Sequence, residues 1–520
     1  MAKRTTLNKA FLSGNEALAR GAWEAGLSVA CAYPGTPSTE IMEALATYKE
    51  LDVQWSVNEK VAYEVVYGAA VGGVRSLFAC KHVGLNVAMD PLMTSSYAGI
   101  TAGFVIVVCD DPQMHSSQNE QDTRWVGIYA KLPVLEPASP AEAKDYVGEA
   151  FKISEKYDTP VIVRMTTRIS HTKEDVKISK RVAVKPKPLV KDMRKYVMVP
   201  GNARLRHVYI EKRLEKLQTF AERTKLNKVE MNDTKLGFIT SSVSYQYLKE
   251  AYPDASILKL GFLYPFCDDK IKAFCKDVKK VVVVEELDPF IENHIKELGI
   301  KKVKAKDSSF RCGELTPGVI KDAVEGKVKN VKPRPGRAPR LCAGCPHWAT
   351  FSVLKKLDLF VAGDIGCYTL GALPPTSALH TCICMGAGVT FNEGLRRAHP
   401  NGKIVGVVGD STFVHSGVTG LINAVYNKAK GIIFILDNST TAMTGGQQHP
   451  ATGWTIRNEP TKVLDLEQLC KACGADNVDV INPIGNVKKL EALVKKRMEE
   501  DALSVIISKD PCVLIKKKSK

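Results

Sequence analysis

The sequence predicts an α/β protein built from parallel sheets that helices cover on both faces. Short, continuously apolar runs at 76–80, 103–109 and 160–165 are typical of strands buried on both sides. Helical patterns at 15–25 and 58–71 alternate with such runs. With 520 residues the chain is too long for one ordinary core, so we expect three or four domains.

The patterns divide the chain into three α/β blocks and two connecting segments. The middle block is the smallest, with strands expected at 237–241 and 281–285. The last block should contain strands at 404–408, 431–436 and 504–508, with a helix at 418–428 between the first two. The expected divisions are residues 1–185, a basic connection at 186–232 with an exposed helix at 204–222, residues 233–330, a proline-rich linker at 331–340, and residues 341–520.

Composition narrows the class of protein. No run approaches the ~20 apolar residues that span a bilayer, and the N-terminus lacks a signal-peptide pattern, so we expect a cytoplasmic protein. The net charge is +17, but the basic residues are dispersed and no nucleic-acid motif accompanies them. A solvated lysine-rich surface is the favoured interpretation. Fourteen cysteines in a cytoplasmic chain argue for buried thiols or metal ligands rather than disulfides.

Polar residues follow two successive strands of the last block. Gly409-Asp410-Ser411 comes directly after 404–408, and Asn438 with Thr440 follows 431–436. An Asp and an Asn at the ends of neighbouring parallel strands can converge on one hard cation such as Mg²⁺, which often also holds a diphosphate. The helix that begins there would donate N–H groups to the same anion. A lone G-D-S triplet is often only a turn or cap, so the strand–motif–helix–strand order carries this inference.

Three polar loops should likewise leave the carboxyl edge of the first sheet, where open α/β folds bind ligands. They are residues 33–38, 81–84 and 110–122. Read locally, Glu59 is a first-turn glutamate behind the cap residue Asn58, and His82 and His115 are structural loop histidines.

Together these motifs resemble the thiamine-diphosphate-dependent 2-oxoacid:ferredoxin oxidoreductases, most closely the α subunits of indolepyruvate oxidoreductases. The G-D-S…D-N spacing is similar to the thiamine-diphosphate motif, and residues 444–447 are similar to the family's T-G-G-Q segment. Further matching runs are Y-P-G-T-P-S at 33–38, W-S-V-N-E-K at 55–60, K-H-V-G-L-N at 81–86, H-S-S-Q-N-E-Q-D at 115–122 and G-D-I-G-C-Y-T-L-G-A-L-P at 363–374.

The resemblance implies a role for each matched residue. Asp410 and Asn438 would bind Mg²⁺ by their side chains and Thr440 by its carbonyl, and Glu59 would contact the aminopyrimidine ring. Thr36 would contact the substrate carboxylate. The remaining cofactor-binding expectations are His82, Gly409, Ser411 and Thr444.

The resemblance also suggests that Arg124 binds substrate, although a surface cation is almost as good an interpretation. Four cysteines, Cys342, Cys345, Cys367 and Cys512, match the ligands of a 4Fe–4S cluster. A zinc site is the closest competitor, but the spacing is not that of a compact zinc finger.

The implied fold is a thiamine-diphosphate-binding fold, with pyrimidine-binding and diphosphate-binding domains, each a doubly wound parallel sheet, flanking a smaller transketolase-C-like domain. The implied reaction is oxidative decarboxylation of 2-oxo acids, arylpyruvates such as indolepyruvate among them, to acyl-CoA with coenzyme A as co-substrate and ferredoxin as electron acceptor. Expected partners are a smaller γ-type β subunit and a soluble ferredoxin, in a dimer of heterodimers. The family's C-terminal ferredoxin-like domain is not expected in this chain. A non-oxidative decarboxylase and a catalytically silent scaffold are the alternatives.

Overall fold

Two compact units make up the chain in the computed structural model, residues 1–333 and residues 334–520. The structure describes residues 8–304, 311–327 and 339–518. The predicted linker at 331–340 therefore lies outside the described residues, apart from its last two positions. None of the helices in the described ranges is both long enough and apolar enough to cross a membrane.

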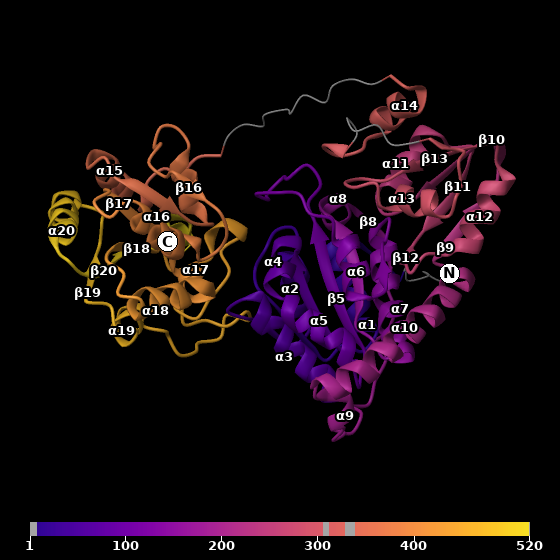
Figure 1. The fold of residues 1–520 in the computed structure, drawn as a ribbon, viewed down its shortest axis with the longest axis horizontal. Helices are drawn as coiled ribbons and strands as arrows, with labels where there is room; N and C mark the ends of the chain where they lie inside the picture. The colour runs from indigo at the N-terminus through magenta and orange to yellow at the C-terminus, as the bar shows by residue number, and fades with distance from the viewer. Residues whose placement is uncertain (1–7, 305–310, 328–338, 519–520) are drawn as a thin grey trace, which may run out of the picture. The chain divides into compact units, whose positions relative to one another are not determined.

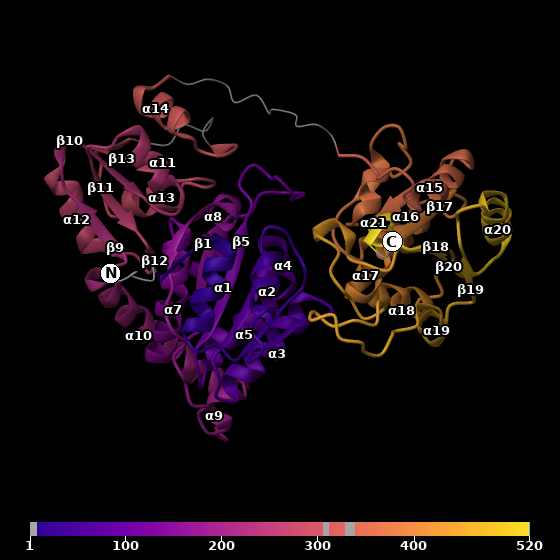
Figure 2. The same ribbon diagram turned by 180° about the vertical axis from the view of Figure 1, so that it is seen from behind.

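A seven-stranded sheet forms the centre of the first unit (Figures 1 and 2). Its order is β12-β6-β7-β5-β4-β2-β3, and every neighbouring pair is parallel except β12 with β6. The strands are β2 (Val29–Ala32), β3 (Asp52–Trp55), β4 (Ser76–Lys81), β5 (Phe104–Asp110), β6 (Val134–Leu135), β7 (Val161–Thr166) and β12 (Phe262–Tyr264). The three predicted strands are confirmed as β4, β5 and β7.

Helices cover both faces of this sheet. α2 and α7 lie on one face, where α1 packs along both, and α3, α5 and α6 lie on the other. The bounds are α1 (Gly14–Glu24), α2 (Thr39–Ala46), α3 (Glu59–Val71), α5 (Met89–Ala98), α6 (Thr123–Ala130) and α7 (Pro140–Tyr157). Tyr63 of α3 meets Phe78 and Phe104 edge to face in the core. The predicted helices at 15–25 and 58–71 are confirmed as α1 and α3, with Asn58 capping α3 through the Val61 N–H.

A five-stranded sheet in the order β14-β13-β10-β11-β9 follows in the same unit. Its strands are β9 (Asn227–Glu230), β10 (Asp233–Thr240), β11 (Ala255–Leu260), β13 (Lys280–Val284) and β14 (Val303–Lys304). Its helices are α11 (Ser244–Ala251), α12 (Asp268–Asp277), α13 (Phe290–Glu297) and α14 (Pro317–Glu325). The predicted strands at 237–241 and 281–285 are confirmed as β10 and β13. β12 lies between β10 and β13 in the sequence but is not part of their sheet. It pairs with β6 instead and so extends the first sheet by one strand.

The basic connection contains a longer helix than predicted, α10 (Pro200–Arg223). Its expected exposure is only partly correct, because Ile210, Arg213, Leu217 and Ala221 form a buried stripe at helical spacing. Arg213 donates to the carbonyl oxygens of Ser96 and Asp158, and burial lowers its pKa to about 10.

The second unit is built on a six-stranded, fully parallel sheet in the order β16-β15-β17-β18-β20-β19. The strands are β15 (Phe360–Gly363), β16 (Thr381–Cys382), β17 (Ile404–Gly409), β18 (Gly431–Asp437), β19 (Asn477–Ile481) and β20 (Leu503–Lys509). The helices are α15 (His347–Lys356), α16 (Ala387–Ala398), α17 (Asp410–Thr412), α18 (Val418–Tyr426), α19 (Leu466–Ala472), α20 (Val487–Glu499) and α21 (Val513–Lys518). Separate apolar cores fill the two faces. The strands predicted at 404–408, 431–436 and 504–508 are confirmed, as is the α/β fold class.

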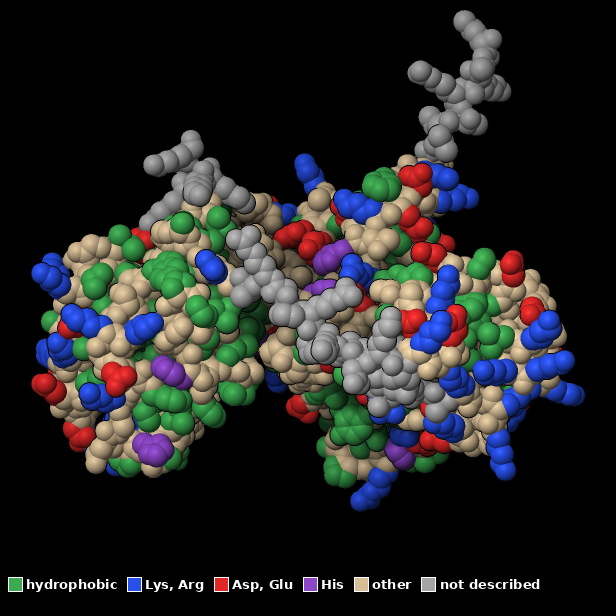
Figure 3. Space-filling model, turned by 90° about the horizontal axis from the view of Figure 1, so that it is seen from above, with side chains coloured by type: hydrophobic (Ala, Val, Ile, Leu, Met, Phe, Trp, Pro, Cys, Tyr) green, Lys and Arg blue, Asp and Glu red, His purple; other side chains and the backbone are tan. Residues whose placement is uncertain are grey.

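Charged side chains of both signs are visible on the face of the molecule that Figure 3 shows. On the face shown in Figure 3, Lys and Arg side chains lie scattered among acidic ones rather than in one continuous patch. This distribution agrees with the solvated lysine-rich surface expected from composition.

Candidate functional site

Two neighbouring strands of the second unit end in the polar residues that the sequence singles out. β17 and β18 are parallel, with Gly409 opposite Leu436, so Asp410 and Asn438 both leave the carboxyl edge of the sheet. Asp410 Oδ1 accepts a hydrogen bond from the Ser411 N–H, and its Oδ2 accepts one from the Ser439 N–H, each at 2.8 Å. Asp410 and Asn438 are both buried. The structure therefore brings the two strand ends together.

Asp410 has another carboxylate, Asp437, and a histidine, His449, as close neighbours. Burial and the negative charge of Asp410 raise the pKa of Asp437, the last residue of β18. Burial acts against ionised Asp410 as well, but His449 and hydrogen bonds to the carboxylate outweigh it and lower the pKa of Asp410. His449 Nε2 lies 3.3 Å from Asp410 Oδ2, out of hydrogen-bond alignment, and neither ring nitrogen of this buried side chain has a hydrogen-bond partner among the described residues. Paired carboxylates with an unsatisfied imidazole form a polar site that a cation and its anionic ligand would complete.

A second histidine orients the Asn438 amide. Asn438 Nδ2 lies 3.3 Å from Nε2 of His347, the first residue of α15. Burial lowers the pKa of His347 to about 4, so the ring is neutral near pH 7 and can accept this hydrogen bond. The Asn438 amide oxygen then points away from His347. Sequence reasoning misses both histidines, whose only signal is that His347 follows C-x-x-C-P and His449 follows T-G-G-Q-Q.

The T-G-G-Q segment forms a tight turn beside this site. Thr444 Oγ1 donates to Gln447 Oε1 at 2.6 Å, and Gln447 Nε2 donates to the Thr444 carbonyl at 3.0 Å. Gly445 and Gly446 both have positive φ, +128° and +91°, which few other residues adopt. The Thr440 carbonyl and the Thr444 hydroxyl therefore belong to a rigid loop that begins where β18 ends.

The four matched cysteines gather next to the same strand ends. The Cys345 N–H donates to the Cys342 carbonyl at 3.1 Å, and the Cys512 N–H donates to the Asn438 carbonyl at 2.9 Å. Burial and then the neighbouring thiols of Cys345, Cys512 and Cys342 raise the pKa of Cys367 to about 12. Within the described ranges, no three Cys, His, Asp or Glu residues converge as they would on a single metal ion. The four thiols are close enough to influence one another's ionisation.

In the first unit, Glu59 begins α3 and is 6% exposed. Gly84 lies against it, because a Cβ atom at position 84 would approach Glu59 Oε1 to 2.4 Å. His82, two residues earlier, is buried; its Nε2 lies 3.2 Å from the Asn119 carbonyl, and its Nδ1 has no hydrogen-bond partner in the part of the chain that the structure describes. Residues 81–84, predicted as a loop, instead end β4 and begin the helix α4 (His82–Val87), and they meet the loop at 110–122.

Thr36 lies in the loop after β2. Its carbonyl accepts a hydrogen bond from Ser116 Oγ at 3.2 Å, so the loops at 33–38 and 110–122 also meet. His115 Nε2 lies 3.1 Å from Glu314 Oε1, so this histidine contacts a carboxylate of the same unit.

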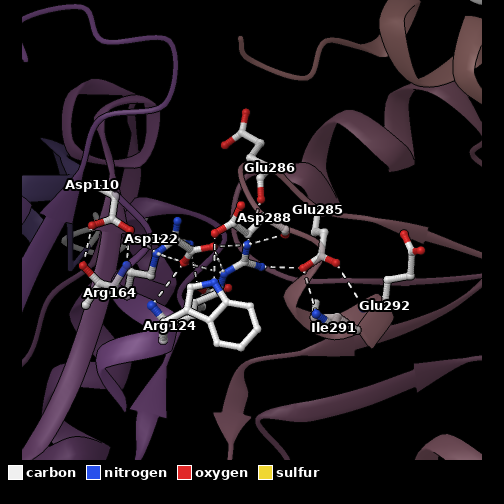
Figure 4. Close-up of polar contacts among 12 residues, drawn as sticks. Asp110, Asp122, Arg124, Arg164, Glu285, Glu286, Asp288, Ile291 and Glu292 are labelled. Atoms are coloured by element: carbon white, nitrogen blue, oxygen red, sulfur yellow. Dashed lines mark hydrogen bonds and ion pairs between the residues drawn. The ribbon is translucent and has the colours of Figure 1, made fainter. Parts of the chain in front are cut away.

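Arg124 is not the surface cation that one of the two sequence interpretations expects. It is 1% exposed, so it is not a surface cation. Figure 4 shows its guanidinium enclosed by the α6 cap and the segment after β13. It donates to Asp122, to Glu285 at 2.6 Å, and to the carbonyls of Glu286 and Asp288. A substrate carboxylate would meet a guanidinium already paired with two carboxylates, which does not support substrate binding by Arg124.

Known proteins match both units. Residues 20–231 match the family "Pyruvate flavodoxin/ferredoxin oxidoreductase, thiamine diP-bdg", and residues 364–508 match "Thiamine pyrophosphate enzyme, C-terminal TPP binding domain". Indolepyruvate oxidoreductase subunit IorA of Archaeoglobus fulgidus is 42% identical over 98% of this chain and 87% of its own length. The protein of the same name from Pyrococcus horikoshii is 39% identical over 97% of this chain and 86% of its own length.

A solved structure shares the fold. The 2-oxoglutarate:ferredoxin oxidoreductase from Magnetococcus marinus, with 2-oxoglutarate, coenzyme A and succinyl-CoA bound, has a TM-score of 0.53 at 18% identity. The match covers 62% of this chain and 66% of that chain.

The fold, the strand-end site and these matches define a class: subunits of thiamine-diphosphate-dependent enzymes that oxidise 2-oxo acids. Within this class, the chain belongs to the indolepyruvate oxidoreductase IorA family, the α subunits of 2-oxoacid:ferredoxin oxidoreductases. The family indicated by the sequence motifs is thereby confirmed.

Proposed function

We propose that the chain binds thiamine diphosphate, Mg²⁺ and a 4Fe–4S cluster and carries out oxidative decarboxylation of arylpyruvates, indolepyruvate among them, to acyl-CoA. Ferredoxin would accept the electrons. The names of the relatives support the substrate class, and the 2-oxoglutarate enzyme of similar fold, which holds coenzyme A and succinyl-CoA, supports the acyl acceptor. The observation that carries the proposal is that four cysteine thiols lie beside the Asp410–Asn438 strand ends.

The residues present fit the cofactor. The Asp410 carboxylate, the Asn438 amide oxygen and the Thr440 carbonyl supply the oxygen ligands that Mg²⁺ prefers. The unsatisfied ring of His449 and the backbone at Gly409 and Ser411, where α17 begins, would meet the diphosphate. Thr444 would contribute from the rigid T-G-G-Q turn.

When bound, thiamine diphosphate supplies a nucleophilic ring carbon and holds the negative charge left as carbon dioxide departs. Glu59 would hydrogen-bond the aminopyrimidine ring and hold a proton at its nitrogen. Burial of Glu59 keeps water from competing for that proton. The hydroxyl of Thr36, which makes no hydrogen bond within the described ranges, would donate to the substrate carboxylate.

An iron–sulfur cluster held beside this site would supply one-electron redox chemistry. Cys342, Cys345, Cys367 and Cys512 would be its ligands. The subunit designation of the relatives implies a further subunit. We expect this partner to be the smaller γ-type subunit, in a dimer of heterodimers that delivers electrons to soluble ferredoxin.

Anaerobic purification followed by iron and sulfide analysis tests this function. We expect about four irons per chain, lost in Cys367→Ala and retained in Cys312→Ala, which removes an exposed cysteine of the first unit. Iron-free wild-type protein that still binds thiamine diphosphate would instead be a non-oxidative decarboxylase. Protein that binds neither would be a scaffold.

A further inference from the structure

Lys81, the last residue of β4, is a buried cation at the carboxyl edge of the first sheet. It is 8% exposed, and in the part of the chain that the structure describes it forms no ion pair. Its Nζ donates to the Ser116 carbonyl at 2.8 Å and to Ser116 Oγ at 3.2 Å. An ammonium group has three protons to donate, so one remains for another acceptor. A buried cation without a counter-ion is costly unless a ligand supplies the missing charge.

Lys81 lies beside the loop that holds Thr36. Ser116 joins the two residues, because its Oγ contacts both Lys81 Nζ and the Thr36 carbonyl at 3.2 Å. A Cβ atom at Gly35 would lie 3.3 Å from the Lys81 Cβ, so the backbone of the Thr36 loop passes directly over this side chain. Next in sequence, the buried His82 has the unsatisfied Nδ1. Polar groups of three segments, the Thr36 loop, the junction of β4 and the helix after it, and the 110–122 loop, therefore lie close together.

Other cations at this edge of the sheet are already neutralised. Arg124 is paired with Asp122 and Glu285, and Arg164 is paired with Asp110 and Glu136. The Asp111 carboxylate nearest Lys81 accepts hydrogen bonds from Ser116, Ser117 and Thr167 and makes no contact with Nζ short enough for an ion pair. Lys81 is thus the positive charge beside Thr36 that makes no direct ion pair with a described carboxylate, although Asp111 acts on it from a greater distance.

We infer that Lys81, with the Thr36 hydroxyl, binds the carboxylate of the 2-oxo acid substrate. This inference rests on the proposed function and assigns to Lys81 the role that the sequence resemblance suggests for Arg124. It also explains a lysine at the end of a strand whose other five residues are all buried and uncharged. A purely structural role, in which Lys81 only holds the 110–122 loop through Ser116, is the competing account.

The two accounts differ in whether removing the charge of Lys81 weakens binding of a carboxylate more than binding of a neutral ligand of the same shape. We would measure inhibition of phenylpyruvate oxidation by 3-phenylpropionate and by its primary amide, which has the same shape without the charge. Wild-type enzyme should prefer the carboxylate, and Lys81→Met should weaken carboxylate binding about ten- to a hundredfold while leaving the amide unchanged. Lys81→Arg should recover part of the preference. Ser116→Ala should cost little, because the Ser116 carbonyl that accepts from Nζ remains.

The wild-type protein provides a second measurement that needs no variant. Burial lowers the pKa of Lys81 to about 8, with Asp111 acting in the opposite direction. Binding of 3-phenylpropionate should therefore weaken as pH rises above about 8, by up to about tenfold per pH unit, while amide binding stays flat. Burial lowers the pKa of His82, and hydrogen bonds lower the pKa of Asp111 despite burial, so neither titrates in this range. Asp110 is held by Arg164 and Thr123.

Each outcome is decisive. A carboxylate preference that survives in Lys81→Met, or that shows no alkaline decline in the wild type, overturns the role of Lys81 while leaving the proposed function in place. Wild-type protein that neither binds thiamine diphosphate nor oxidises any 2-oxo acid overturns the proposed function itself. Thiamine diphosphate affinity, measured separately in Lys81→Met, should match the wild type.

Discussion

Gly84 lies directly against the Glu59 carboxylate: a Cβ atom at position 84 would approach Glu59 Oε1 to 2.4 Å and its Cγ to 2.7 Å. Two segments that sequence reasoning treats separately, the start of α3 and the K-H-V-G segment at the start of the following helix, are therefore in direct contact. Gly84 does not adopt positive φ, so space for Glu59, rather than backbone conformation, requires a glycine here.

Gly84→Ala should displace the Glu59 carboxylate and reduce turnover about a hundredfold, because small misplacements of a catalytic group are costly. Initial rates with saturating thiamine diphosphate measure this. Gly68→Ala is the matched control: it lies within α3, meets nothing within 4 Å, and should leave turnover unchanged while raising stability slightly. Equal turnover in both variants would show that the position of Glu59 does not matter.

Asp410→Asn should weaken binding of thiamine diphosphate with Mg²⁺ more than about tenfold, because it removes the charged ligand at the strand end. Calorimetric titration with the cofactor and Mg²⁺ measures the affinity. Asn423→Ala, on the exposed face of α18, should bind as the wild type does. Unchanged affinity in Asp410→Asn would remove this strand end from the cofactor site.

Arg124→Met should lower the free energy of unfolding of the first unit by about 3–5 kcal/mol, since it leaves two buried carboxylates without their cation. Urea denaturation followed by fluorescence provides the measurement. Lys152→Met breaks an exposed pair with Glu149 and should cost less than about 1 kcal/mol. A comparable loss in the two variants would contradict the buried network of Figure 4.

Asp364 should make the stability of the second unit depend on pH. Burial raises its pKa from an ordinary value of 3.8 to about 7, although the Gly388 and Gly386 N–H groups donate to it. Because the folded state binds the extra proton, its contribution to stability is complete below about pH 4 and is lost as pH rises to about 7. Asp364→Asn should flatten this dependence, which amounts to about 4 kcal/mol at most. Parallel pH profiles for the wild type and Asp364→Asn would contradict a raised pKa.

The sequence predicts those features that depend on residues close together in the chain, and it misses those that depend on contacts between distant residues. Long apolar strands such as β4, β5 and β18 follow from local pattern, and strand-end motifs place Asp410 beside Asn438 because parallel strands share an edge. β12 is only three residues long, and its pairing with β6 depends on tertiary contacts that no local pattern encodes. Arg124 illustrates the same limit, since its burial depends on Glu285, 161 residues away.

Sequence reasoning also misses the two histidines that lie beside the strand-end site. His347 and His449 lie near Asp410 only after α15 and the T-G-G-Q turn fold onto the sheet. Their spacing from the recognised motifs follows no general rule. Residue types at strand ends are therefore predictable, whereas the groups that orient them become visible only in three dimensions.

The most direct test of the central claim is whether a 2-oxo acid reduces a cluster in this protein. The chain, purified anaerobically with its partner subunit, would be mixed with indolepyruvate and coenzyme A while visible absorbance and electron paramagnetic resonance are recorded. We predict bleaching and the signal of a reduced 4Fe–4S cluster, dependent on thiamine diphosphate and absent in Cys367→Ala. Release of carbon dioxide and aldehyde with no change at the cluster would contradict the account.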